Sequence, residues 1–260
     1  MILRKDPKIR APLKTIMTET EATFPLMNHL VELKKRLTIC AIAISASFVL
    51  CLFFAKDLYA FLSLPLKQVL PAGSFFIATH PIEAWLTYLK TAGLSSLFVS
   101  APVLFYELWQ FLSPGLYASE KKYTLAFVFF SSLLFVGGAL FGYFVIFPFT
   151  FDYFLSVIVD TDIHFLPRME DYLSFSFKML LAFGLIFELP LFIVFLVLSG
   201  IVSVRQLISF QKYLIVCALV VGAILTPPDV ISQILLSLPI IALYQVGLFF
   251  AWVVTKKRFS

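Results

Sequence analysis

The stretch YLSFSFKMLLAFGLIFELPLFIVFLVLS, from Tyr172 to Ser199, decides the fold class. Almost all of it is apolar, and about 20 apolar helical residues are enough to cross the hydrocarbon core of a bilayer. Its charged exceptions are Lys178 and Glu188, and Pro190 is expected to kink the helix. The segment therefore predicts a transmembrane helix that carries an acid near its middle.

Five further runs have the same apolar character: Thr38 to Ala55, Thr91 to Leu112, Tyr123 to Phe147, Tyr213 to Thr226, and Val230 to Val254. The composition agrees, because 61% of the 260 residues are hydrophobic and 13% are charged, against about a quarter charged in soluble domains. We therefore predict an all-α polytopic membrane protein with six transmembrane helices, the last two of them short. The fifth run would reach only about 21 Å. Either Ser209 to Lys212 enter the membrane, the bilayer thins there, or the boundary is misplaced by a turn.

Basic residues are unevenly distributed over the connections. Fifteen of the 20 Lys and Arg residues fall on the side of the termini and five on the other side. Because Lys and Arg are enriched in cytoplasmic loops, both termini are expected to be cytoplasmic. We expect a poorly ordered tail over residues 1–23, a single six-helix domain over 24–255 and a short tail over 256–260. The two longest outer connections, 56–90 and 148–171, are long enough to form short helices or a cap.

Signatures of catalysis and cofactor binding are missing from the sequence. It has no phosphate-binding loop, no HExxH and no GxSxG motif. The three cysteines lie in apolar runs without metal-ligand or disulfide spacing. We therefore expect no enzyme activity, no cofactor and no metal. The net charge of +5 comes without a basic groove, so nucleic acid is not an expected partner.

The segment from Phe24 to Leu37 precedes the first span. Its leucines at 26, 30, 33 and 37 form an apolar stripe, which predicts a helix lying at the cytoplasmic membrane interface. Glu32 and Arg36 are four residues apart and can form an ion pair of a few tenths of a kcal/mol. An acid among so many cations could equally be a receptor group.

Two further acids lie near the same surface. Glu120 is close to the start of the third span, where the helix dipole favours a carboxylate. Glu107 is late in the second span, at the same cytoplasmic surface.

Polar residues inside the membrane need partners. Burying Glu188 costs about 2.5 to 3.5 kcal/mol, so we expect a water-filled concavity or a polar neighbour; a protonated carboxyl satisfied by another helix is the alternative. At the outer turn of the last hairpin, Asp229 can cap the sixth helix, with Thr226 beside it. Gln233 is then left facing lipid or another helix, and a polar residue of a partner helix would satisfy it.

Four motifs add up to a resemblance: His29-Leu-Val-Glu-Leu-Lys-Lys-Arg36, Ser113-Pro-Gly-Leu-Tyr117 followed by Glu120, Phe187-Glu-Leu-Pro190, and Leu225-Thr-Pro-Pro-Asp-Val-Ile-Ser-Gln233. Together they resemble the TatC family, the polytopic subunit of the twin-arginine protein translocase. The resemblance covers the chain from about Phe24 to its C-terminus.

The resemblance implies a receptor in the bacterial cytoplasmic membrane for the twin-arginine signal peptides of folded cargo proteins, with export driven by the proton gradient. Glu32 and Glu120 would recognise the paired arginines, with Phe111 beside them. Lys34 stands where the family usually has Arg, and Glu107 where it often has Gln. This extra acid could strengthen the attraction for arginines or sit in a headgroup network with Lys121.

The resemblance also implies further contacts. The polar group formed by Thr226, Asp229 and Gln233 would dock single-span partners of the TatA/TatB type. Glu188 would lie in a concave face embedded in the bilayer, and Pro65 would be structural. Self-association in a larger complex is expected. A rival interpretation is a proton-coupled secondary transporter that uses Glu188, although the sequence shows no clear inverted repeat.

Overall fold

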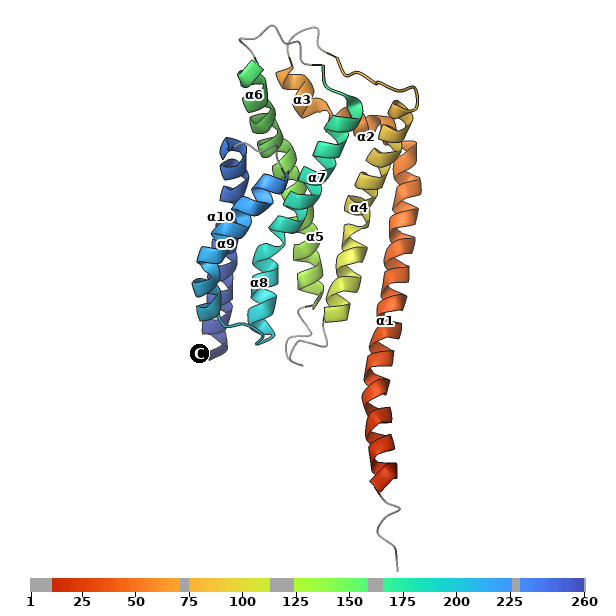
Figure 1. Cartoon of the computed structure of the whole chain (residues 1–260), viewed down its shortest axis with the longest axis vertical. Helices are drawn as coiled ribbons and strands as arrows, with labels where there is room; N and C mark the ends of the chain where they lie inside the picture. The colour runs from red at the N-terminus through yellow and green to blue at the C-terminus, as the bar shows by residue number, and fades with distance from the viewer. Residues whose placement is uncertain (1–10, 71–74, 113–123, 159–165, 226–229, 260) are drawn as a thin grey trace, which may run out of the picture.

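The computed structural model describes residues 11–70, 75–112, 124–158, 166–225 and 230–259, and their fold is helical (Figure 1). Its helices are α1 (Ala11–Phe53), α2 (Ala55–Leu62), α3 (Leu64–Val69), α4 (Glu83–Leu112), α5 (Thr124–Phe141), a π-helical turn (Gly142–Ile146), α6 (Phe147–Ile158), α7 (Met169–Phe187), α8 (Leu189–Leu198), α9 (Val204–Leu225) and α10 (Val230–Phe259). Within the described residues, the extended structure is one isolated bridge between Ile77 and Arg168. The all-α prediction is confirmed.

Six stretches are long and apolar enough to cross a membrane: Leu30–Phe53, Glu83–Leu112, Leu125–Ser156, Met169–Leu198, Val204–Leu225 and Val230–Lys256. Each corresponds to one of the predicted spans.

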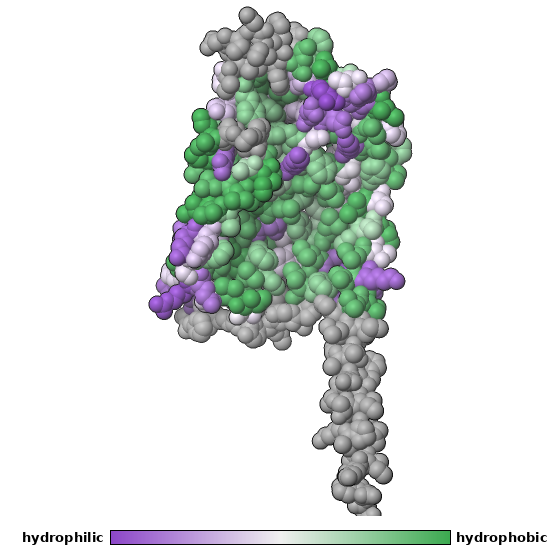
Figure 2. All heavy atoms as spheres, viewed as in Figure 1, coloured by the Kyte–Doolittle hydropathy of each residue, from purple (hydrophilic) through white to green (hydrophobic). Residues whose placement is uncertain are grey.

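Helix α1 begins and α10 ends at the same end of the bundle, which we call the terminal end (Figure 1). The opposite end, which carries α2 and α3, is called the loop end. Figure 2 shows a mainly apolar surface between these two ends.

The first helix differs from the prediction. Residues 24–37 do not form a separate interfacial helix, because α1 runs for 43 residues and leads straight into the first span. No Gly or Pro stands between Leu26 and Phe53 to break it. Leu30 and Leu37 of the predicted apolar stripe remain exposed. Because α1 begins at Ala11, it includes part of the predicted tail, while the division at residue 23 stays a prediction.

The fifth helix is longer than predicted. Helix α9 has 22 residues, which corresponds to about 33 Å, and α10 has 30 residues. The prediction of two short final helices is therefore wrong. The predicted start at Tyr213 was too late because a charged side chain does not end a helix. Lys212 lies within α9, and its ammonium group is 5.0 Å from the centre of the Tyr213 ring.

The loop end is built from short helices, as predicted. Helices α2 and α3 occupy the first long connection, and Pro65 is buried in the first turn of α3. The second long connection begins within α6, which continues the third span past Pro148. A wider π-helical turn immediately precedes α6, close to the proline that lacks a backbone donor.

The centre of the bundle is held by close contact between α5 and α7. A Cβ atom on Gly138 would lie 2.3 Å from the carbonyl oxygen of Phe183, and one on Gly184 would lie 2.7 Å from the Phe135 ring. Small residues let helix backbones approach in this way. Phe147 and Phe183 are fully buried beside this contact, so the middle of the protein is a rigid scaffold for the polar groups at its ends.

Candidate functional site

Three charged side chains meet at the terminal end, and we call them the Glu32–Arg36–Glu107 cluster. Arg36 donates from Nε and Nη2 to Glu32 Oε1, over 3.1 and 2.5 Å. Its Nη1 donates to Glu107 Oε2 over 3.0 Å. Glu32 and Arg36 are one turn apart on α1, so helix geometry brings them together. Glu107 comes from α4, which packs against α1.

The solvent exposure of the three side chains falls from Glu32 at the surface to Glu107 in the interior. The side chain of Glu32 is 38% exposed, that of Arg36 18% and that of Glu107 9%. Lys35, Tyr106 and other residues join them around a hollow of about 270 Å³. One guanidinium therefore links an accessible carboxylate to an almost buried one.

Of the other residues predicted for this site, Phe111 lies near the cluster, Lys34 lies away from it, and Glu120 is not described. Phe111 is half-buried on α4, one turn beyond Glu107 on the same helix face. Lys34 is exposed on another side of α1, beside Leu30, Leu33 and Leu37, while Lys35 lines the hollow of the cluster. Glu120 and Lys121 lie outside the described residues. The partner of Glu107 within the described residues is Arg36, which neither sequence alternative for Glu107 named.

Glu188 marks a break in the fourth span. Helix α7 ends at Phe187 and α8 begins at Leu189, which confirms the interruption predicted from Pro190. The hydroxyl of Ser131 on α5 faces the Glu188 carboxyl group, and Trp109 Nε1 donates to the same hydroxyl over 2.7 Å. Glu188 Oε1 is buried without a hydrogen-bond partner among the described residues. The predicted polar neighbour is thus present on an adjacent helix.

Gln233 is bonded inside the last hairpin. Its side-chain Nε2 donates to the carbonyl oxygen of Leu219 on α9 over 3.0 Å. Ser237, one turn along α10, donates to Ala218 over 3.1 Å. Thr226 and Asp229 lie outside the described residues. The packing of α9 against α10 thus satisfies one amide hydrogen of Gln233. No partner helix is needed to bind that hydrogen.

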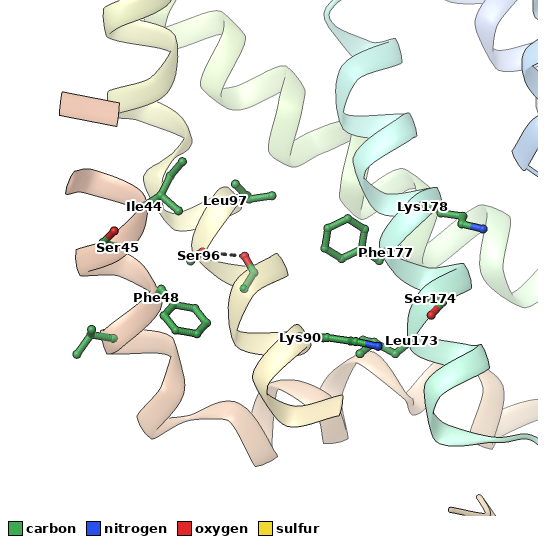
Figure 3. A pocket seen from close by; sticks show the side chains of 12 residues that line it. Ile44, Ser45, Phe48, Lys90, Ser96, Leu97, Leu173, Ser174, Phe177 and Lys178 are labelled. Carbon is green, nitrogen blue, oxygen red and sulfur yellow. Dashed lines mark hydrogen bonds between the residues drawn. The ribbon is translucent and has the colours of Figure 1, made fainter. Parts of the chain in front are cut away.

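A groove of about 740 Å³ lies between α1, α4 and α7 (Figure 3). Phe48, Leu97 and Phe177 give it largely apolar walls. Lys90 reaches from α4 towards Leu173, whereas Lys178 leaves α7 on the side away from α4 (Figure 3). None of the predicted site residues lines this groove, so it is separate from both acidic sites.

Sequence reasoning missed a buried acid at the loop end. Glu83 is 3% exposed, and its Oε2 accepts hydrogen bonds from the Thr79 amide at 2.6 Å and the Thr79 hydroxyl at 2.9 Å. The amides of His80 and Glu170 also donate to this carboxylate, each over 3.3 Å. Arg168 Nη2 lies 3.7 Å from it. The local signal was an acid in the first turn of a helix, but its contacts with residues 168 and 170 cannot be read from the sequence.

Within the described ranges, no three His, Cys, Asp or Glu side chains are grouped so that they could hold a metal ion. The polar sites are therefore made of carboxylates with hydrogen-bond donors. Such sites suit the recognition of cationic groups or the fixing of the fold.

Comparison with known proteins identifies the family. The model of the family described as Sec-independent protein translocase protein (TatC) matches residues 28–239. The protein of that name from Desulforapulum autotrophicum is 42% identical over 244 residues, which cover 94% of this chain and 90% of that protein. The Escherichia coli K12 protein of that name is 42% identical over 231 residues, with 89% of each chain covered.

A solved structure agrees with the sequence matches. The crystal structure described as the twin arginine translocase receptor TatC has a TM-score of 0.78 at 33% identity, and the match covers 87% of this chain and 99% of that chain. This is a family of protein-transport components and not of enzymes. With its helical fold and six apolar spans, the chain belongs to the TatC family.

Proposed function

We propose that this protein is the signal-peptide receptor of a twin-arginine translocase, and that the terminal end binds the paired arginines. The observation that carries the proposal is the Glu32–Arg36–Glu107 cluster, where a surface-accessible carboxylate already binds a guanidinium group. Glu120 supplies a second acid and Phe111 an aromatic wall. The relatives' names describe a Sec-independent translocase, and a similar solved structure is described as a twin arginine translocase receptor.

The chemistry of the site favours arginine over lysine. A guanidinium group is planar and presents donors along two edges, so it can bind a carboxylate through two hydrogen bonds at once. Arg36 donates to Glu32 from Nε and Nη2 along one such edge, and one carboxylate oxygen, Oε1, accepts both hydrogen bonds. A lysine ammonium group is a single point charge and cannot reproduce this pairing. The site should therefore bind an Arg-Arg peptide more tightly than a Lys-Lys peptide.

The terminal end faces the cytoplasm in this proposal. Lys34, Lys35, Arg205 and Lys256 lie at that end, in keeping with the enrichment of basic residues in cytoplasmic loops. Signal peptides of folded cargo would then reach Glu32 from the side on which they are made. The protein would reside in the bacterial inner membrane and draw the energy for export from the proton gradient.

The hairpin of α9 and α10 is the proposed docking site for single-span TatA/TatB-type subunits. Gln233 is partly exposed, and no described residue donates to its side-chain oxygen. The same two helices carry exposed apolar side chains, among them Ile224, Ile231 and Ile234. An apolar helix with one polar residue fits such a surface, because a hydrogen bond between helices is favourable in lipid. Thr226 and Asp229 would complete this docking site.

Glu188 is proposed as a polar site within the membrane for the assembled translocase. Its buried Oε1 has no partner in the described part of the chain, and burying an unsatisfied carboxyl group is costly. A polar group of another subunit or of the translocating peptide would satisfy it. Self-association in a larger complex would bring such groups close to the break between α7 and α8.

A photo-crosslinking experiment tests the receptor function. A photoreactive amino acid at Phe111 should crosslink a peptide that carries Arg-Arg several-fold more than the same peptide with Lys-Lys. The substitution Glu120→Gln should reduce crosslinking of the Arg-Arg peptide while the protein stays folded. Equal crosslinking of the two peptides would count against the receptor function. A photoreactive group at Trp85, which is exposed on α4 near the loop end, provides the control.

A further inference from the structure

The carboxylate proposed to receive the peptide is already occupied by an arginine of the protein itself. Arg36 makes two hydrogen bonds to Glu32 Oε1. A signal-peptide guanidinium that binds Glu32 in the same way must displace Arg36 from that oxygen. Arg36 therefore competes with the ligand, and the outcome depends on where it goes when displaced.

We propose that Arg36 is an internal competitor for the signal-peptide arginines, and that Glu107 holds Arg36 when the peptide takes over Glu32. This inference rests on the proposed function. It assigns to Arg36 and Glu107 the role of setting the affinity for the peptide, without contact between Glu107 and the peptide.

The geometry of the guanidinium group allows the exchange. Nε and Nη2 face Glu32, whereas Nη1 faces Glu107. These donors are on different parts of the same planar group, so the bond to Glu107 can persist while the edge that faces Glu32 is released. The exchange therefore needs only a small rotation of the Arg36 side chain and no movement of α1 or α4.

The ion pair with Glu107 is stronger than the ion pair with Glu32, and the proposed exchange requires this order. Glu32 and Arg36 form an i,i+4 pair near the surface, and pairs of that kind contribute little to stability. Glu107 is only 9% exposed, and a nearly buried carboxylate left without its cation is strongly unfavourable. Arg36 is thus held more firmly by Glu107 than by Glu32, so the bond to Glu32 yields first.

Competition by Arg36 also lowers the affinity of Glu32 for every cationic ligand. A ligand gains from binding Glu32 only what exceeds the two hydrogen bonds that Arg36 gives up. An incoming arginine replaces both bonds, whereas a lysine replaces them with a single point charge. The internal arginine therefore suppresses weak occupation of Glu32 by lysines or other amines.

The test measures binding of a dye-labelled Arg-Arg peptide to the purified full-length protein in detergent by fluorescence anisotropy. Arg36→Gln with Glu107→Gln removes the competitor and its holder together, so no buried charge is left unpaired. This double variant should bind the peptide about fivefold more tightly than the wild type. Its preference for Arg-Arg over Lys-Lys should stay as in the wild type, because removal of a competitor that both peptides must displace strengthens the binding of both by the same factor.

The single variants separate the roles of the two residues. Glu107→Gln alone should weaken peptide binding by about threefold, because Arg36 then rests on Glu32 alone. The same substitution in the Arg36→Gln background should have no such effect, because there is no arginine left to hold. Arg205→Gln, which removes one exposed positive charge at the same end, is the control and should bind like the wild type.

The possible outcomes distinguish failure of the proposed competition from failure of the proposed receptor function. Unchanged or weaker binding to the folded double variant would overturn the competition, and an equal effect of Glu107→Gln in both backgrounds would mean that Glu107 contacts the peptide directly. If the wild type binds neither peptide, the proposed receptor function fails instead. Thermal unfolding of each variant, followed by circular dichroism, confirms that the compared proteins are folded.

Discussion

The two ends of the bundle each pair an arginine with an acid, but they use the acid differently. At the loop end, Glu83 is 3% exposed and accepts hydrogen bonds from the backbone amides of residues 79, 80 and 170. At the terminal end, the Glu32 side chain is 38% exposed and binds the side chain of Arg36. The first acid is held by backbone donors and the second by a side chain.

The difference indicates which acid can exchange its partner. Backbone amides move only with their segments, so a ligand could displace them from Glu83 only by opening the loop end. A side-chain donor near water can rotate away at little cost. We therefore assign Glu83 to the fold and Glu32 to binding, although both acids lie near the ends of membrane spans and both have an arginine nearby.

The largest expected effect concerns Glu83. Glu83→Ala leaves the amides of Thr79, His80 and Glu170 without their acceptor and Arg168 without its buried partner, and unsatisfied buried donors are costly. The apparent melting temperature in detergent, followed by circular dichroism, should fall by several degrees. Asp171→Asn is the control, because Asp171 is an exposed neighbour 3.8 Å from the same arginine. Equal stability of the Ala variant and the wild type would contradict the assignment of Glu83 to the fold.

An intermediate effect is expected at Trp109, which is buried in the last turn of α4, close to the terminal end. Trp109→Phe retains an aromatic ring against Phe127 and Phe195 but loses the hydrogen bond to Ser131. The free energy of unfolding should fall by about 1 kcal/mol. Trp85→Phe, at a site that is 60% exposed, should change it much less. A loss no greater than that of the control would mean that the contact with Ser131 adds nothing to stability.

The smallest effect on stability is expected at Glu32. Glu32→Gln removes a near-surface ion pair within one helix, so the free energy of unfolding should change by no more than about 0.5 kcal/mol. Thermal and denaturant unfolding of the variant and the wild type measure this change. A loss comparable to that of Glu83→Ala would show that Glu32 is structural and would remove the distinction between the two ends.

Much of the fold could be predicted from the sequence, because apolar runs longer than about 20 residues have few alternatives to crossing a membrane. The break at Glu188 followed from Pro190 for an equally local reason. Helix ends were less predictable. Helix α1 continues through the segment expected to be interfacial, and α9 begins at Val204 and not at Tyr213, because charged residues do not end helices when their side chains can reach the headgroups.

The candidate site could be predicted only in part. The pair of Glu32 and Arg36 follows from a spacing of four residues. The contact between Arg36 and Glu107 joins residues that are 71 positions apart, and it depends on how α1 lies against α4. The network around Glu83 likewise joins two loops that are distant in sequence. Such contacts come from tertiary packing, which hydrophobic periodicity and charge counts do not report.

The most direct test of the account is the affinity of the purified protein for Arg-Arg and Lys-Lys signal peptides, measured with the wild type and with Glu32→Gln. The wild type should bind the Arg-Arg peptide about tenfold more tightly, and Glu32→Gln should abolish that preference without unfolding the protein. Equal affinity of the wild type for both peptides, or an undiminished preference in the variant, would contradict the assignment of Glu32 as the arginine receptor.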